Sequence, residues 1–136
     1  MKTRTTFACA CLAALLSCAA FAAPHTPRKG SPERTAIMTS LHHVLGGGKH
    51  TPRVTVDTFN VERGWAYVTG GFDYADGAKL EPDFTEGPGT NFDALLHHEG
   101  SVWRVKRRVY AGDVEEPEFM RDFPKAPHSI FKTKAG

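Results

Sequence analysis

Cysteine is missing from most of the chain. The three cysteines of the sequence are Cys9, Cys11 and Cys18. Beyond them neither a disulfide nor a cysteine-ligated zinc site can form, and there is no thiol nucleophile. None of the serines lies in the G-x-S-x-G pattern of a nucleophile elbow, so the sequence gives no indication of a covalent hydrolase. Any fold of the later residues must be stabilised by its apolar core.

A long hydrophobic run is also missing, because no stretch approaches the roughly 20 apolar residues that cross a bilayer as a helix. The longest apolar run extends from Phe7 to about Leu16 and follows the basic residues Lys2 and Arg4. A basic start followed by a short apolar run is typical of a secretory signal peptide. No transmembrane segment is predicted.

The residues after this run predict where the leader is removed. Ala20-Phe21-Ala22 has the small-x-small cleavage pattern, which predicts a signal peptide over residues 1–22 and a mature chain that begins at Ala23. We therefore expect the protein in the periplasm or secreted. Leu15-Leu16-Ser17-Cys18 also resembles a bacterial lipobox, so the alternative is a lipid anchor at Cys18.

The mature chain has no excess of either charge. The whole sequence contains 17 Lys and Arg and 15 Asp and Glu, and removal of Lys2 and Arg4 with the leader leaves 15 of each sign. A formally neutral chain predicts no affinity for nucleic acid or for membrane surfaces.

The seven histidines include two adjacent pairs, His42-His43 and His97-His98. Neighbouring residues point apart on a helix and to opposite faces of a strand. The His-x-x-x-His spacing that places two ligands on one helix face is absent. The sequence therefore predicts no metal site and no cofactor, and leaves weak histidine-based metal binding as a minor hypothesis.

A helix is predicted over about residues 32–45. Ser31 can cap its first turn, Pro32 suits the first helical position, and the glycines at 46–48 end it. One arc of this helix is apolar and contains Ile37, Met38, Leu41, Val44 and Leu45. The preceding residues 23–31 have no periodicity and are expected to form a flexible segment.

The rest of the chain indicates strands. "RVTVDTFNVERGWAYVTGGFDY" and "TNFDALLHHEGSVWRVKRRVYAG" each contain two β-rich runs around a turn, the second at Glu99-Gly100. With a two-residue loop there, Asp93 would lie opposite Lys106, and the apolar residues would share one face: Phe92, Ala94, Leu96, Trp103, Val105 and Val109. We predict an α+β fold over residues 32–136, in which one amphipathic helix packs on a three- or four-stranded antiparallel sheet and a short C-terminal helix or ordered tail follows.

The predicted binding residues are two aromatic and two basic residues: Trp65, Tyr67, Arg104 and Arg107. Trp65 and Tyr67 share a face of their strand, which lies either in the core or on the open side of the sheet, where it would form an aromatic platform. Aromatic and arginine side chains are the usual anchors of interfaces. Arg104 lies on the outer face of the second hairpin, whereas the alternation places Arg107 on the core face.

The sequence also resembles a group of small exported bacterial proteins of unknown function. The resemblance is carried by "ERTAIMTSLHHVL", "GWAYV", an acidic loop with "DG", "DALLHHEGSVWRV", and "GDV" before an aromatic-rich tail. One helix followed by four strands is similar to the cystatin-like and NTF2-like pattern. The resemblance implies a helix packed on a sheet and carries no activity.

The leading hypothesis is a noncatalytic binding or protein-interaction module of the bacterial periplasm, with an unknown ligand and with a protein or a second copy as partner. The main alternative is a small cone-fold enzyme that uses acid–base residues, for which Asp57, His98 and Tyr67 are candidates by residue type alone.

Overall fold

The computed structural model describes residues 23–78, 90–110 and 116–132 of the chain. The predicted signal peptide and lipobox therefore lie outside the described residues. Within the described part, no helix has the length and apolar character needed to cross a membrane.

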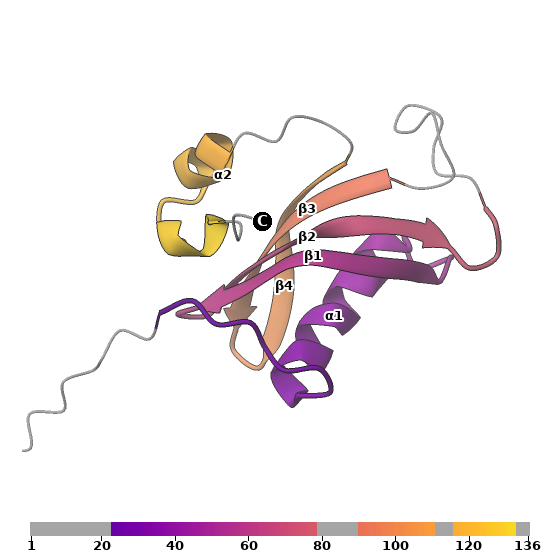
Figure 1. Cartoon of the computed structure of the whole chain (residues 1–136), viewed down its shortest axis with the longest axis horizontal. Helices are drawn as coiled ribbons and strands as arrows, with labels where there is room; N and C mark the ends of the chain where they lie inside the picture. Colours follow the sequence, from indigo (N-terminus) through magenta and orange to yellow (C-terminus); the bar gives the residue numbers. More distant parts are fainter. Residues whose placement is uncertain (1–22, 79–89, 111–115, 133–136) are drawn as a thin grey trace, which may run out of the picture.

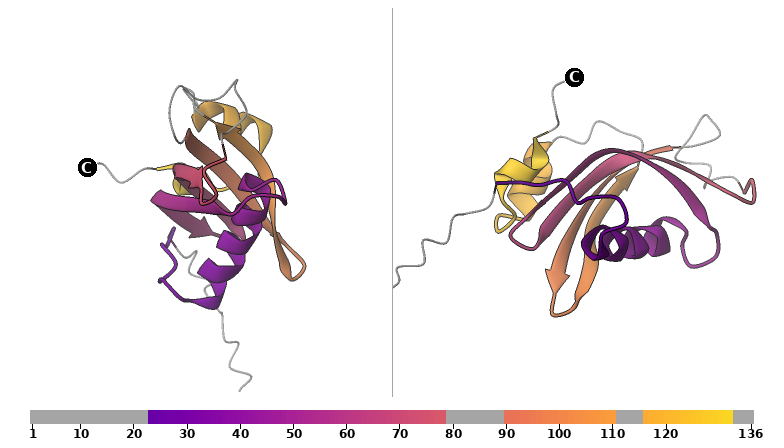
Figure 2. Two further views of the ribbon diagram at one scale, coloured as in Figure 1. Left: turned by 90° about the vertical axis from the view of Figure 1, so that its right-hand side faces the viewer. Right: turned by 60° about the horizontal axis from the view of Figure 1, so that its bottom comes forward.

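Four antiparallel strands form one sheet in which each strand pairs with its neighbours in the chain. In sheet order they are β1 (Pro52–Glu62), β2 (Trp65–Tyr74), β3 (Thr90–Glu99) and β4 (Val102–Tyr110). The sheet bends around helix α1 (Pro32–Leu45), which lies on its concave face (Figures 1 and 2). Helix α2 (Glu116–Asp122) and the 3₁₀ helix η1 (His128–Phe131) lie on the other face. The predicted α+β class, with a sheet, one longer helix and a short C-terminal helix, is confirmed.

Helix α1 begins and ends where the sequence predicts. The Ser31 side chain accepts a hydrogen bond from the main-chain N–H of Arg34 at 3.2 Å, which satisfies one of the free donors of the first turn. The helix ends at Gly46, where a Cβ would lie only 2.2 Å from the carbonyl oxygen of His50. Ile37, Leu41 and Leu45 point into the sheet and are fully buried.

The first hairpin turns through Arg63 and Gly64, both of which have positive φ, as the tight two-residue turns that suit twisted strands require. Strand β1 carries a bulge between Val56 and Thr58, opposite Gly70 of β2. A Cβ on Gly70 would lie 1.9 Å from the carbonyl oxygen of Thr55. Only glycine therefore allows the two strands to approach this closely.

The second hairpin differs from its predicted register. Glu99 pairs with Val102, so the loop is Gly100-Ser101, one residue later than expected. A bulge at Lys106 then shifts the pairing, and Asp93 lies opposite Val109 instead of Lys106. Because a bulge reverses the alternation beyond it, Val109 packs on the opposite face from Phe92.

The sheet has an apolar cluster on each face. The cluster under α1 contains Ile37, Leu41, Leu45, Phe59, Val61, Ala66, Val68, Phe72, Phe92, Ala94, Leu96 and Trp103. The cluster under α2 and η1 contains Trp65, Tyr67, Leu95, Phe119, Ala126, Ile130 and Phe131. Both faces of the sheet are therefore covered by the chain itself.

The segment before α1, expected to be flexible, makes specific contacts with the sheet. His25 and Val61 exchange two main-chain hydrogen bonds of 2.9 and 2.8 Å, which adds a short bridge to the outer edge of β1. Arg34 donates to the carbonyl oxygen of Pro27 at 3.0 Å. The segment thus lies between α1 and the last part of β1.

Candidate functional site

The aromatic pair Trp65 and Tyr67 lies on the face opposite α1, which is the open side in the platform hypothesis. This face is not exposed, however, because the C-terminal segment covers it, and the two residues are only 8% and 2% exposed. The Tyr67 ring contacts the rings of Phe119 and Phe131 edge-on, with centroids 5.8 and 5.0 Å apart. The expectation of an exposed aromatic platform is therefore corrected.

Polar contacts fix the C-terminal segment on this face. The Asn60 side chain donates to the carbonyl oxygens of Ile130 and Lys132 at 2.8 and 2.9 Å. The Ser129 hydroxyl donates to the carboxylate of Glu62, which is 5% exposed. These bonds connect η1 to β1.

Arg107 also holds the C-terminal segment. Its guanidinium forms ion pairs with Asp122 and, at 3.6 Å, with Glu118, and lies 5.5 Å from the ring centre of Phe119. The prediction that Arg107 lies on the helix-facing side is wrong, because the bulge at Lys106 turns it to the other face.

Arg104 lies elsewhere, at the turn of the second hairpin. It is 63% exposed and its Nε is 3.3 Å from the Glu99 carboxylate. Lys106 donates to the same carboxylate at 2.7 Å. The Lys106 hydrogen bond is the main reason why the pKa of Glu99 lies below its usual range. The four predicted binding residues thus do not form one site.

The three candidate acid–base residues are not brought together either. Asp57 is exposed on β1, His98 packs on Trp103, and Tyr67 is buried under η1. The Tyr67 hydroxyl instead donates to the Asp93 carboxylate at 2.8 Å. Burial raises the pKa of Asp93, and the Tyr67 hydrogen bond opposes this rise. Asp93 was not singled out from the sequence for acid–base chemistry. Its place between Phe92 and Ala94 on a strand is nevertheless a pattern that can indicate a carboxyl group near the core.

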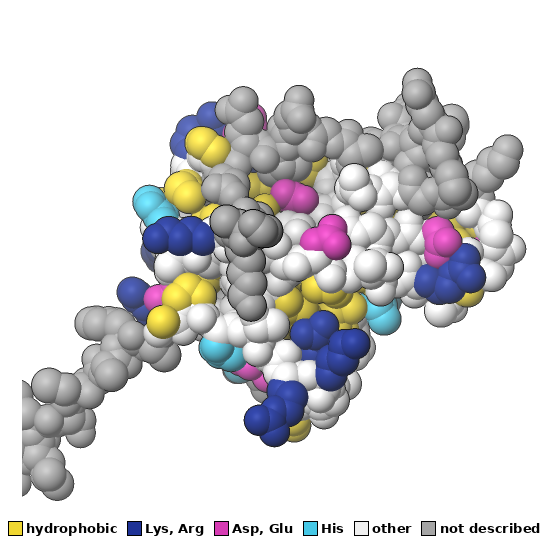
Figure 3. Space-filling view, in the orientation of Figure 1, with side chains coloured by type: hydrophobic (Ala, Val, Ile, Leu, Met, Phe, Trp, Pro, Cys, Tyr) yellow, Lys and Arg dark blue, Asp and Glu magenta, His cyan; other side chains and the backbone are white. Residues whose placement is uncertain are grey.

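His97 and His98 point to opposite faces of the sheet, as their spacing predicts. The His97 ring lies against Trp65 in a tilted arrangement with centroids 4.2 Å apart, and the centre of the His98 ring lies 5.0 Å from that of Trp103, on the other face. Within the described ranges, no three side chains of the metal-binding types are grouped to hold an ion. Charged side chains of both signs are scattered over the described part of the face in Figure 3, and neither sign forms a continuous patch.

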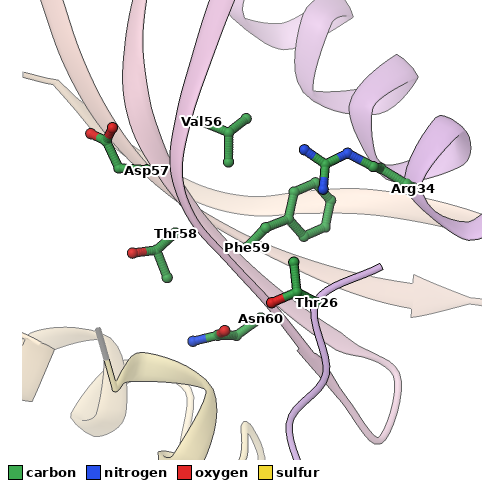
Figure 4. Close-up of a pocket in the computed structure, with 7 residues that line it drawn as sticks. All are labelled: Thr26, Arg34, Val56, Asp57, Thr58, Phe59 and Asn60. Atoms are coloured by element: carbon green, nitrogen blue, oxygen red, sulfur yellow. The ribbon is translucent and has the colours of Figure 1, made fainter. Parts of the chain in front are cut away.

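A hollow of about 220 Å³ lies at the outer edge of β1, between this strand, the start of α1 and the segment before it (Figure 4). Val56, Phe59 and Arg34 lie on its helix side, whereas Asp57, Thr58 and Asn60 project on the other side of the strand. The remaining lining residue is Thr26. The hollow therefore follows the edge of the sheet rather than either face.

Two opposite charges line this hollow. The Arg34 guanidinium lies 4.6 Å from the ring centre of Phe59 and donates to the Pro27 carbonyl, and in the described part of the chain no carboxylate pairs with it. Asp57 makes no hydrogen bond or ion pair with any described residue and is exposed. A partner at this edge would meet a cation, an anion, hydroxyl groups and one aromatic ring.

The two edges of the sheet differ in how far they are covered. At β4, the Ser40 hydroxyl donates to the carbonyl oxygen of Trp103 at 2.7 Å, and the Arg108 side chain donates to the carbonyl oxygen of Val44 at 2.7 Å. Helix α1 therefore lies along this edge, although the Trp103 carbonyl is the one main-chain group of β4 with a described partner outside the sheet. At β1, the bridge between His25 and Val61 covers one end only. From Pro52 to Phe59 no described group outside the sheet bonds to the main chain of β1.

Comparisons with protein-family models, with curated proteins and with solved structures find no match to this chain.

Proposed function

We propose that the chain is an exported, noncatalytic protein-interaction module of the bacterial periplasm, which binds an extended segment of a partner along the open edge of β1. The observation that carries this proposal is the unequal coverage of the sheet. Both faces are buried by the chain's own helices and α1 packs mainly beside β4, whereas the main chain of β1 has no described partner outside the sheet from Pro52 to Phe59 and lies next to the hollow.

An open strand edge offers a general mode of recognition. Its unpaired N–H and C=O groups form main-chain hydrogen bonds with an added strand, while neighbouring pockets select side chains. Here the hollow beside Phe59 would supply that selection, because it combines an aromatic ring with Arg34 and Asp57. Exposed edges also promote aggregation unless they are covered or charged. Arg53 and Asp57 place a charge of each sign on this edge, so it has one of the features that limit unspecific aggregation.

One contact favours the alternative of acid–base chemistry, namely the hydrogen bond between Tyr67 and Asp93. A carboxyl with a raised pKa beside a phenol is a combination that enzymes use. The proposal of binding is preferred because the Tyr67 ring is 2% exposed under Phe119 and Phe131, so a substrate would have to displace the C-terminal segment to reach the hydroxyl.

Site-specific photo-crosslinking in cells tests the proposal. A benzoylphenylalanine residue at Thr58, which lines the hollow, should yield protein adducts on irradiation. The same residue at Thr39, on the exposed side of α1, is the matched control and should yield none. Equal adduct formation at the two positions, or none at Thr58, would contradict the proposal.

A further inference from the structure

We propose that the open edge of β1 pairs with β1 of a second copy of this chain, in an antiparallel arrangement centred on Thr55. The inference rests on the proposed function, since it names the partner of the same edge. It would join two sheets into one continuous sheet across a two-fold axis, the commonest symmetry of protein dimers.

The sequence of the open edge is complementary to itself. Residues 53–57 read Arg-Val-Thr-Val-Asp. In an antiparallel pair centred on Thr55, Arg53 lies opposite Asp57 of the second copy, and Val54 lies opposite its Val56. The two-fold axis repeats both pairs. Opposite charges on directly facing residues stabilise a strand pair, whereas like charges destabilise it.

The main-chain hydrogen bonds fit the same register. The carbonyl oxygen of Thr51 accepts from the N–H of Ala75 at 3.0 Å, so the polar groups of Thr51 point toward β2. Because these groups alternate in direction along a strand, those of Val54 and Val56 point outward. In an antiparallel pair, two facing residues whose main-chain N–H and C=O groups point toward each other exchange two N–H···O hydrogen bonds. The Val54–Val56 pairs of the proposed dimer meet this requirement.

The side chains also face compatible partners. Val54 and Val56 pack against the cluster under α1, so apolar side chains would meet on that face. Arg53 lies on the other face, where Asp73 accepts two hydrogen bonds of 2.7 Å from its guanidinium. Asp57 also projects on the side away from α1 and has no described partner (Figure 4). The dimer would give it the positioned guanidinium of Arg53.

The ends of the pairing are defined by two features described above. Beyond Asp57, the register places Pro52 and Thr51 of the second copy beside Thr58 and Phe59, where the hollow leaves room for them. The bridge from His25 to Val61 then closes the edge. Bulges on edge strands discourage pairing, but the bulge in β1 lies between Val56 and Thr58, at the end of the five complementary residues.

The proposed contact is short, so the dimer should be weak. Stable interfaces bury about 1,200–2,000 Å², and smaller ones are characteristic of transient association. Dimerisation should therefore be concentration-dependent, with a dissociation constant in the micromolar range or above.

Two charge reversals test the pairing by sedimentation velocity, on protein expressed from the full sequence. Asp57→Arg gives a chain with positive residues at both positions 53 and 57, and Arg53→Asp gives a chain with negative residues at both positions. Each variant alone should dimerise at least about tenfold more weakly than the unmodified chain, because like charges would face each other. An equimolar mixture of the two should recover a dimer, since every facing pair is again of opposite charge.

A charge reversal on the opposite strand edge is the matched control. Arg104→Asp makes the same charge change at an exposed arginine of β4 and should leave dimerisation unchanged. Hydrogen exchange gives a second measurement on the unmodified chain, in which the amides of Val54 and Val56 should become protected as its concentration rises. An unmodified chain that stays monomeric, or variants that fail to recover a dimer when mixed, would overturn the self-pairing. If Thr58 then still crosslinks to a different protein, the proposed function stands and its partner is not a second copy.

Discussion

In the pair formed by Tyr67 and Asp93, burial and one hydrogen bond act in opposite directions on the pKa of the acid, and burial has the larger effect. Burial favours the neutral form of Asp93 and raises its pKa, while the hydrogen bond from Tyr67 favours the charged form. The folded chain therefore holds this proton more tightly than the unfolded chain does. The tighter binding of this proton adds to the free energy of unfolding at acid pH. This contribution falls as the pH rises from the pKa of the unfolded chain, about 3.9, through the higher pKa of the folded chain.

Tyr67→Phe should raise the pKa of Asp93 further and lower the free energy of unfolding at pH 7 by about 1–3 kcal/mol, because a half-buried carboxylate loses a hydrogen bond. Urea unfolding at several pH values and an NMR titration of Asp93 measure the two effects. The control is Tyr74→Phe, which removes a hydrogen bond to the Leu45 carbonyl oxygen and no carboxylate contact. If both variants show the same pH dependence, the described coupling is wrong.

Gly70 offers a second prediction at the level of a single residue. Gly70→Ala should reduce stability by at least about 2 kcal/mol, since its Cβ would overlap the main chain of Thr55 and β1 would have to move. Gly71→Ala is the matched control, because its nearest neighbour, Oδ1 of Asn91, would lie at an ordinary 3.5 Å. Thermal unfolding of the two variants compares them, and similar midpoints would argue against the close approach of β1 and β2.

At the scale of secondary-structure elements, the C-terminal segment determines what the sheet exposes. Tyr67 is buried because Phe119 and Phe131 pack on its ring, Phe123 lies against Trp65, and Asn60 holds η1 by two hydrogen bonds. The segment thus occupies the surface that an aromatic platform would present to a partner.

Phe131→Ala should destabilise the fold by about 3–5 kcal/mol, as expected for truncation of a buried phenylalanine. Because the Tyr67 ring would lose its contact with Phe131, it should become more accessible, which solvent-perturbation difference spectra of tyrosine measure. Phe123→Ala, at a partly buried position of the same segment, should cost less. A Phe131→Ala variant with unchanged stability and unchanged tyrosine exposure would show that the segment does not cover this face.

The sequence predicted the helix and the strands better than the register between strands and the packing on the sheet. Helix α1 depends on local residues, such as Ser31 and Pro32, and was predicted from them, whereas the turn of the second hairpin was placed one residue too early. The bulge at Lys106 arises from competition between strands, which leaves no clear signal in one strand's sequence, so the face of Arg107 was predicted wrongly. Alternation correctly placed Trp65 and Tyr67 on one face. It could not show that phenylalanines more than 50 positions later would cover them.

At the scale of the whole molecule, export is the property that the order of the first residues predicts. Intact-mass analysis of protein recovered from cells should find a chain that starts at Ala23 or within a residue or two of it. A diacylated N-terminal Cys18 would establish the lipoprotein alternative instead. A product that keeps Met1 would reject both.

The order of the strands has a consequence for the rate of folding. Because every strand pairs with its neighbour in the chain, the sheet can form by successive closure of adjacent segments, which favours faster folding than long-range pairing does. The C-terminal segment must pack back onto β1 and β2, far away in the chain, through Asn60 and Tyr67. We expect it to dock last, so that a folding chain passes through a short-lived state in which Trp65 and Tyr67 are open to solvent.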